Sequence, residues 1–513
     1  MSRIRRNIHR KKLNKILRVA DDEQFFTMMW SIHAAQTGRE DKARPFLEFP
    51  KEAATTDMAS KYAVHPWKCE TLLNEALATP KQKITPGNTF KTLNCRTFSS
   101  IALALNTLTK LEDAEDGLTL KRVSVLNELH RLSQRQFGWQ MGLITLAGLY
   151  RSGFIYSGPK TKLFFESTNE FSLNEFSLAC FAIRAALEDK PAIVRDIDLS
   201  SIGISEKKRE DILNTISIRH TEARKKASTL RNTKKHTGYK KSLFREYPCV
   251  SFGQNGERIH GPLPDLVLLR STSGVFYDVI NGGGDVRNEI SSRFERYCIE
   301  FLQCTLLTAR VRASFKYQFT KRQQIDSPDI LVSANKGPVS LIIECKARRL
   351  SYEARFSEDP VSEARDAYNE LSKGLFQIWR FVAHQRLGLI PNEPISADVR
   401  GIVLTLDTWL SAASVMQDEV FELANLRASE DANITEEDRI PVIFCPIGDL
   451  EQTLGVSTDS SFFETVFAAT DDKFKGWSLS GVHRELGLDR SSTEKKYPFA
   501  DRMADVFPWW RKQ

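Results

Sequence analysis

The chain has 513 residues, of which 41% are hydrophobic and 27% are charged, a balance typical of a globular protein with sizeable cores. This length predicts two to four domains, and no apolar run approaches the ~20 residues of a membrane-spanning helix, so we expect no membrane partner. The net charge of +8 is compatible with a polyanionic partner but does not require one.

Eight cysteines are spread along the chain, with no Cys-x-x-Cys pair and no accompanying histidine cluster. Isolated cysteines of this kind indicate reduced, mostly buried thiols, and they disfavour a structural zinc site. We therefore expect a cytoplasmic protein.

The first 18 residues carry eight Lys or Arg and no acid. A thin apolar stripe, which includes Ile4, Ile8 and Leu13, runs along them. Three interpretations stay open: a basic arm on nucleic acid, a solvated disordered tail, or a docking helix. A contact with nucleic acid would gain affinity from counterions released at each neutralised phosphate. We assign residues 1–20 to a basic N-terminal arm.

Residues 21–205 are expected to form a mainly helical domain. Helical periodicity covers 96–110, 118–150 and 171–187, among other segments. Two short apolar pieces at 154–157 and 163–166 have the pattern of a small hairpin. A hairpin after two helices favours a winged-helix module, although other small helical domains have the same pattern.

Residues 206–245 accumulate Lys and Arg against few acids, which predicts a basic helix leading into a linker. Such charge either follows a phosphate backbone or is simply solvated, and both interpretations stay open. The candidate nucleic-acid-binding residues in this segment are Lys225, Lys226, Arg231, Lys234 and Lys235.

Residues 246–285 change to strand-like apolar runs at 248–252, 266–269 and 275–280. Turn-rich segments separate these runs. We expect them to begin a domain that extends over residues 246–455.

Two apolar runs, 327–332 and 341–346, predict adjacent strands joined by an Asn-Lys-Gly-Pro turn. Pairing would bring Asp329, at the start of the first strand, close to the end of the second. Glu344 and Lys346 lie two residues apart there, so their side chains share a face. Two carboxylates with water suit Mg²⁺ or Mn²⁺, and a nearby Lys can orient an attacking water. The alternative is a strand end whose Glu and Lys are merely solvated.

The order Pro328-Asp329, fourteen residues, then Glu344-Cys345-Lys346 resembles the signature of the PD-(D/E)XK nuclease superfamily, also called restriction-endonuclease-like. Four other Glu-x-Lys tripeptides occur in the chain, but only this one ends an apolar strand with a Pro-Asp strand upstream. The resemblance implies that Asp329, Glu344 and the backbone carbonyl of Cys345 bind Mg²⁺ or Mn²⁺. It implies that Lys346 positions the attacking water.

The helix expected at 287–307 carries Glu295 beside Phe294, a residue of its buried stripe. Many members of the superfamily carry such a Phe-Glu pair, whose Glu binds or orients a metal ion. By this resemblance we assign a catalytic and metal-binding role to Glu295. The alternative is a surface Glu that pairs with a neighbouring Arg.

The amphipathic helix expected at 363–386 carries Gln377 four residues before Phe381. This pattern resembles the Gln-containing helix of the RecB-like and lambda-exonuclease-like branches, with Phe381 in place of the usual Tyr. The resemblance implies that Gln377 contacts the scissile phosphate or the nucleophilic water. Lys373 lies one turn earlier on the same side and is a candidate phosphate ligand. For both, a solvated helix face is the alternative.

We therefore predict a mixed α/β protein with a restriction-endonuclease-like central sheet flanked by helices in its C-terminal half, followed by a C-terminal extension at 456–513. The predicted function is metal-dependent, endonucleolytic hydrolysis of DNA in bacterial defence against phage or foreign DNA. Two alternatives stay open: an RNA-cleaving nuclease, and a non-catalytic nucleic-acid-binding protein on the same fold. Because no Walker A pattern occurs, ATP-driven translocation would need a separately encoded ATPase or sensor protein. A homodimer also stays open.

Overall fold

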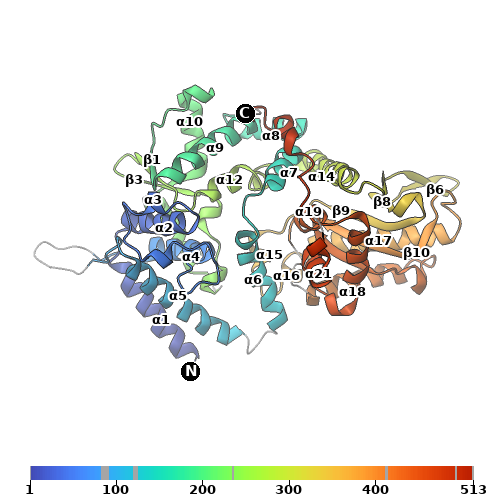
Figure 1. The fold of residues 1–513 in the computed structure, drawn as a ribbon, viewed down its shortest axis with the longest axis horizontal. Coiled ribbons are helices and arrows are strands. Elements are labelled where there is room, and N and C mark those ends of the chain that lie inside the picture. The colour runs from blue at the N-terminus through green and yellow to red at the C-terminus, as the bar shows by residue number, and fades with distance from the viewer. Residues whose placement is uncertain are drawn as a thin grey trace, which may run out of the picture.

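The computed structural model describes residues 2–82, 92–119, 125–233, 236–408, 410, 414–491 and 494–510. These residues form a mixed α/β structure with a mainly helical N-terminal lobe and a C-terminal lobe built on the largest described sheet (Figure 1). No helix in the described residues is both long and apolar enough to cross a bilayer.

The N-terminal half is mainly helical. Its α-helices are α1 (Ser2–Arg18), α2 (Asp22–Gln36), α3 (Glu40–Ala43), α4 (Pro66–Ala78), α5 (Phe98–Thr119), α6 (Val125–Gln140), α7 (Leu146–Tyr156), α8 (Pro159–Thr168), α9 (Leu173–Asp189), α10 (Glu206–Ile216), α11 (His220–Arg231), α12 (Asp265–Ser271) and α13 (Val275–Val279). A small sheet has the order β1-β4-β3-β2. Its strands are β1 (Ala192–Val194), β2 (Ser217–Arg219), β3 (Cys249–Phe252) and β4 (Arg258–His260).

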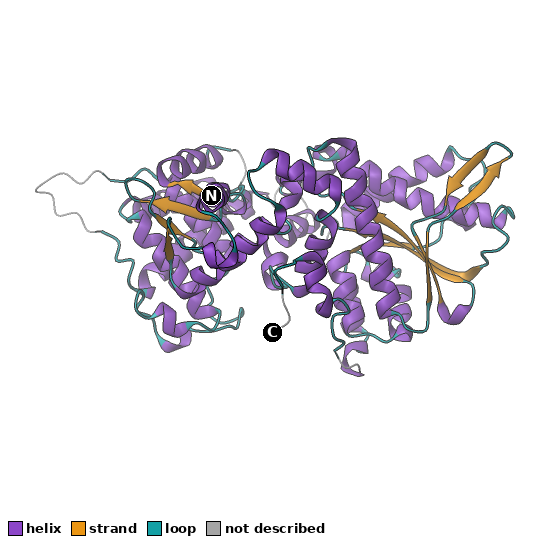
Figure 2. Ribbon diagram, turned by 90° about the horizontal axis from the view of Figure 1, so that it is seen from above, coloured by secondary structure: helices purple, strands orange, loops and turns teal. Residues whose placement is uncertain are grey.

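The C-terminal lobe is organised around a five-stranded mixed sheet of order β11-β10-β9-β8-β5 (Figure 2). Its strands are β5 (Arg310–Ala313), β8 (Ile330–Ser333), β9 (Val339–Lys346), β10 (Ile395–Thr405) and β11 (Val442–Pro446). β9, β10 and β11 are parallel, whereas β8 is antiparallel to both β9 and β5. A separate hairpin joins β6 (Lys316–Thr320) to β7 (Gln323–Asp326).

The remaining helices cover or extend this sheet. They are α14 (Gly283–Thr305), α15 (Tyr352–Arg355), α16 (Pro360–Glu363), α17 (Arg365–Arg386), α18 (Ser414–Ser429), α19 (Ile447–Gly455), α20 (Asp459–Ala469), α21 (Leu479–Glu485) and α22 (Met503–Val506).

Strand β9 is buried on both faces because its apolar side chains alternate between two cores. Leu341 and Ile343 join a core that includes the buried stripe of α14, while Ile342 joins a core that includes the buried stripe of α17. A continuous Leu/Ile/Val run is typical of a central strand covered by helices on both sides. The sheet is therefore held between α14 and α17.

A third core belongs to the N-terminal lobe and joins α1, α2, α4 and α5 to β2, α11 and β3. Helix α1 contributes Leu13 and Leu17, which are fully buried. The interpretation of this segment as a disordered tail is therefore wrong, because two apolar anchors fix the helix to the lobe. Residues 206–231 form α10, β2 and α11, so the basic segment is helical as expected, and only its described end at 236–245, with two short 3-10 turns, is linker-like.

The expected strands at 266–269 and 275–280 are wrong, because these segments form α12 and α13. The expected hairpin at 154–157 and 163–166 is also wrong, because both pieces lie in α7 and α8. Without that hairpin, the described residues of this region give no support to a winged-helix module. Apolar runs of four to six residues do not separate a strand from a helix that is buried on several sides.

The single helix expected over 118–150 is interrupted. Helix α6 ends at Gln140, α7 begins at Leu146, and Gly142 between them has a left-handed φ of 84° that favours glycine. The C-terminal extension packs on the central core through α20, α21 and Phe507. Trp509 reaches Ser177 through its indole N–H at 3.1 Å and lies against Phe181.

Candidate active site

The hairpin of β8 and β9 brings Asp329 and Glu344 to one edge of the sheet. Ile330 pairs with Ile343, so Asp329 lies one residue beyond the paired region, beside the end of β9. The Asp329 carboxylate accepts a hydrogen bond from the backbone N–H of Cys345 at 2.7 Å. The N–H and C=O of a strand residue point to the same side, so the Cys345 carbonyl also points towards β8. The predicted juxtaposition of Asp329 and Glu344 is present.

Glu344, Lys346 and Gln377 form a connected polar group between β9 and α17. The Lys346 ammonium donates to Oε1 of Glu344 at 2.9 Å and to the amide oxygen of Gln377 at 3.3 Å. Glu344 and Lys346 share a face of β9, and Gln377 approaches them from α17. The structure thus brings together Asp329, immediately before β8, Glu344 and Lys346 on β9, and Gln377 on α17.

Gly374 lets α17 approach the strand at this point. A Cβ atom at Gly374 would lie 2.7 Å from Cε of Lys346 and 3.1 Å from Cγ of Glu344. Sequence reasoning did not single out Gly374. The available signal was a glycine in the interior of a strongly amphipathic helix, where it costs about 1 kcal/mol relative to Ala and implies a packing reason.

Burial sets the electrostatics of the site. It raises the pKa of Glu344 to about 7, although the Lys346 ammonium lowers it, and it also raises the pKa of Asp329. Burial opposes the charge on Lys346, but Glu344 more than compensates and holds the pKa of the ammonium above its usual range. The positive charge near Asp329 and Glu344 is therefore too small to offset the cost of burying both carboxylates in their ionised form.

Glu295 lies on α14 and approaches the group from the other side of the sheet edge. Its carboxylate accepts a weak hydrogen bond from the Ser314 hydroxyl at 3.5 Å, just beyond β5. Burial, followed by repulsion from Asp329, raises the pKa of Glu295 to about 7. Its charge is thus coupled to that of Asp329. In the described residues, however, no three His, Cys, Asp or Glu side chains form a group that could hold a metal ion.

The candidate phosphate ligands outside this group differ in availability. Lys373 and Lys225 are exposed. Lys226 pairs with Glu246 at 3.4 Å, and Arg231 lies 3.5 Å from the buried Glu75. Arg231 therefore supports the packing of α11 on the N-terminal lobe. Lys234 and Lys235 lie outside the described residues.

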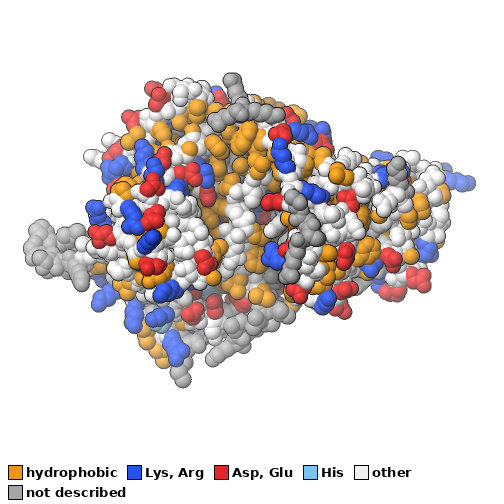
Figure 3. All heavy atoms as spheres, viewed as in Figure 1, with side chains coloured by type: hydrophobic (Ala, Val, Ile, Leu, Met, Phe, Trp, Pro, Cys, Tyr) orange, Lys and Arg blue, Asp and Glu red, His pale blue; other side chains and the backbone are white. Residues whose placement is uncertain are grey.

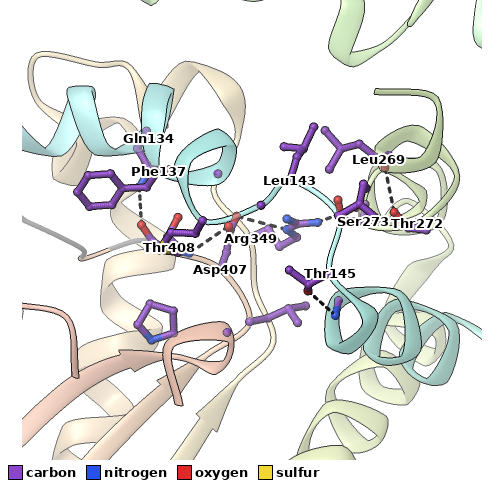
Figure 4. A pocket seen from close by; sticks show the side chains of 18 of the residues that line it. Gln134, Phe137, Leu143, Thr145, Leu269, Thr272, Ser273, Arg349, Asp407 and Thr408 are labelled. Atoms are coloured by element: carbon purple, nitrogen blue, oxygen red, sulfur yellow. Dashed lines mark hydrogen bonds and ion pairs between the residues drawn. The ribbon is translucent and has the colours of Figure 1, made fainter. Parts of the chain in front are cut away.

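A cavity of 1840 Å³ lies between the N-terminal helices and the ends of β9 and β10, but none of the predicted catalytic residues lines it. Arg349, three residues after Lys346, donates to Asp407 at 3.3 Å and to the backbone carbonyl of Ser273 at 2.6 Å (Figure 4). Arg355 also pairs with Asp407, and Gln134 donates to the Thr408 carbonyl. These contacts join the loops that follow β9 and β10 to the preceding half of the chain.

Searches against protein-family models, curated proteins and solved structures found no match to this chain. The function of this chain is therefore inferred from its residues and their arrangement alone.

Proposed function

We propose that this protein is a divalent-metal-dependent nuclease that hydrolyses phosphodiester bonds in DNA on a restriction-endonuclease-like sheet. The observation that carries the proposal is the convergence of Asp329, Glu344 and Lys346 at one edge of the sheet. A motif match alone does not require that convergence. A solvated strand end, the alternative for Glu344, does not fit its burial.

The order of elements around the site supports the same proposal. Helix α14 precedes β5, β8 and β9, then α17 crosses to β10, which is parallel to β9. A mixed sheet between two helices, with the acidic residues at the end of its central hairpin, is the arrangement that the resemblance implied. The helix before the sheet carries Glu295, and the helix after it carries Gln377.

The donor set fits a hard divalent cation. Oε2 of Glu344 is buried and accepts no hydrogen bond of normal geometry from the described residues. Burial raises the pKa of both Asp329 and Glu344, and a cation between them would compensate their charge. Asp329, Glu344 and the Cys345 carbonyl would hold Mg²⁺ or Mn²⁺, with Glu295 acting through water. Bound there, the ion would polarise a phosphoryl oxygen and lower the pKa of the attacking water.

The remaining residues have complementary tasks. Lys346 holds a positive charge beside the two acids, where it orients the attacking water and stabilises negative charge developing on phosphorus oxygens. Gln377 accepts from Lys346 through its amide oxygen, which leaves its NH₂ group for a phosphate. Glu295, whose carboxylate is close enough to Asp329 to be affected by its charge, would hold a water bound to the same ion.

The test is incubation of the purified chain with supercoiled plasmid in Mg²⁺ or Mn²⁺ and in EDTA, beside Glu344→Gln. We expect metal-dependent nicking or linearisation by the wild type and none by Glu344→Gln. The matched control is Glu422→Gln, the same change at an exposed position of α18, which should cleave normally.

Equal cleavage by Glu344→Gln would refute the assigned site. If a parallel panel shows cleavage of RNA but not of duplex or single-stranded DNA, the protein is an RNA nuclease that uses the same site. Binding without cleavage of any of these would favour the non-catalytic alternative. A role in bacterial defence remains a prediction.

A further inference from the structure

Helix α1 presents an outward face of positive charge that is not used within the protein. Its exposed cations, Arg3, Arg5, Lys11, Lys12, Lys15 and Arg18, form no ion pair within the described residues. The helix contains no acid at all. Figure 3 shows Lys and Arg side chains gathered over α1, at the lower left of the molecule.

The opposite face of α1 is fixed to the lobe. Leu13 and Leu17 are fully buried, and the helix packs along α5. Arg6 pairs with Glu115 at 3.2 Å, and Arg10 pairs with Glu75 at 2.5 Å. Both acids are almost completely buried, at 1% and 4% side-chain exposure. The outward cations are thus displayed on a rigid helix, at fixed spacing.

The charge pattern of α1 is unfavourable for an isolated helix. Lys11 and Lys15 lie one turn apart, as do Lys15 and Arg18, and like charges at these spacings destabilise a helix. Arg3 and Arg5 lie near the positive end of the helix dipole, where acids are favoured. A sequence that breaks these local rules without internal compensation indicates an anionic partner.

The 1840 Å³ cavity between the N-terminal helices and the ends of β9 and β10 is a poorer site for a polyanion. Its lining includes many arginines, but each of them already contacts an acid of this chain: Arg135, Arg151, Arg231, Arg245, Arg270, Arg349 and Arg355. A phosphate bound by any of these arginines would have to compete with an existing ion pair. On α1 it would meet cations that have no internal partner.

We propose that the outward face of α1 binds the phosphate backbone of nucleic acid without reading its sequence. The inference rests on the proposed function in one respect, that the nucleic acid is the substrate of the nuclease site. A row of exposed cations along one helix face, with no acid among them, suits the repeating phosphates of a strand. A membrane surface fits less well, because Ile4 and Ile8, 66% and 45% exposed, are the only large apolar residues on that face.

The test is binding of a fluorescein-labelled DNA duplex in EDTA, measured by fluorescence anisotropy over a range of salt concentrations. The variant is the triple change Lys11→Gln, Lys12→Gln and Lys15→Gln. Gln matches Lys in helix propensity, so the fold should persist, and thermal unfolding checks this. We expect binding at least about 10-fold weaker and a salt dependence of log K less steep by about 2 to 3 units, because each lost phosphate contact removes about 0.9.

The matched control removes three exposed lysines elsewhere in the N-terminal half, by Lys51→Gln, Lys61→Gln and Lys162→Gln. This control has the same net charge as the test variant and should bind nearly as well as wild type. The triple change Lys11→Arg, Lys12→Arg and Lys15→Arg keeps the charge and should also retain binding.

An unchanged salt slope in the Gln variant, or an equal loss in the control, would overturn the proposal. The proposal would also be overturned if the Gln variant lost its binding to anionic lipid vesicles in a parallel assay but still bound DNA like the wild type. Because EDTA excludes metal-dependent cleavage, this assay is independent of the nuclease test. If the chain cleaves neither plasmid, single-stranded DNA nor RNA but shows α1-dependent DNA binding, the proposed function is refuted. Phosphate-backbone binding by α1 then stands, and only the clause that the bound nucleic acid is a substrate is lost.

Discussion

The Lys346 side chain lies against Gly374, in space that the side chain of any other residue at position 374 would occupy. A Cβ at Gly374 would lie 2.7 Å from Cε of Lys346, closer than carbon atoms can approach without displacement. Two residues from different elements, α17 and β9, are thus coupled by steric fit. The position of the only cation that contacts Glu344 in the described residues depends on a glycine.

We expect Gly374→Ala to lower cleavage by about 10- to 100-fold, because a displacement near 1 Å of a catalytic group has an effect of that size. In open space the same change would stabilise a helix by about 1 kcal/mol. The control is Gly448→Ala in α19, where no atom lies within 4 Å of the added Cβ. Plasmid-cleavage rates are the measurement, and a fully active Gly374→Ala protein would contradict the steric coupling.

Lys346→Ala should lower cleavage by about 10²- to 10³-fold, the range found when a preorganised electrostatic group is removed. Glu344 would then be buried without its cation, and its pKa would rise because Lys346 lowers it in the wild type. Single-turnover cleavage rates and thermal unfolding separate the chemical loss from loss of fold. The comparison variant is Lys373→Ala, an exposed lysine nearby, expected to affect DNA binding more than the chemical step.

Mg²⁺ or Mn²⁺ should raise the unfolding temperature of the wild type relative to EDTA. A cation that binds only the folded site contributes about 2.7 kcal/mol at a concentration about 100 times its Kd. The shift should vanish in Glu344→Gln and persist in Glu422→Gln. This measurement needs no substrate, and an equal shift in all three proteins would place the metal elsewhere.

Asp407 should make folding sensitive to acid. Burial raises the pKa of this carboxyl, but Arg355 and Arg349 outweigh burial and hold it at about 2, below the ordinary 3.8. Its contribution to stability is complete above pH ~3.8 and is lost as the pH falls towards 2. Lowering this pKa from 3.8 to about 2 corresponds to about 2–3 kcal/mol of folding free energy.

Asp407→Asn should therefore unfold at lower denaturant concentration than wild type at pH 7, and this difference should shrink between pH 4 and pH 2. Urea titrations at several pH values are the measurement. Asp398→Asn, at an exposed position of β10, should show no such difference. A deficit of Asp407→Asn that is constant with pH would show that its ionisation is not the cause.

Period and length predicted the elements that carry the site. The apolar runs predicted β8 and β9, and apolar residues spaced three to four apart predicted α14 and α17. Each of these elements buries side chains in the period expected for its type. The short apolar runs at 266–269 and 275–280 were wrongly assigned to strands, since α12 and α13 bury several sides at once, whereas the run at 248–252 does form β3. Pro264 at the N-cap and Asp265 as the first residue of α12 are a helix-start signal in the sequence.

The sequence by itself determined that Asp329 would lie near Glu344 and Lys346, because a hairpin with a short turn allows little else. Only the tertiary structure decided that Gln377 and Gly374 meet these residues, that α1 is fixed to its lobe, and that Arg349 reaches Ser273. These contacts join residues far apart in the chain. They depend on how helices pack on a sheet and on which charges are buried with a partner, and no local pattern encodes either.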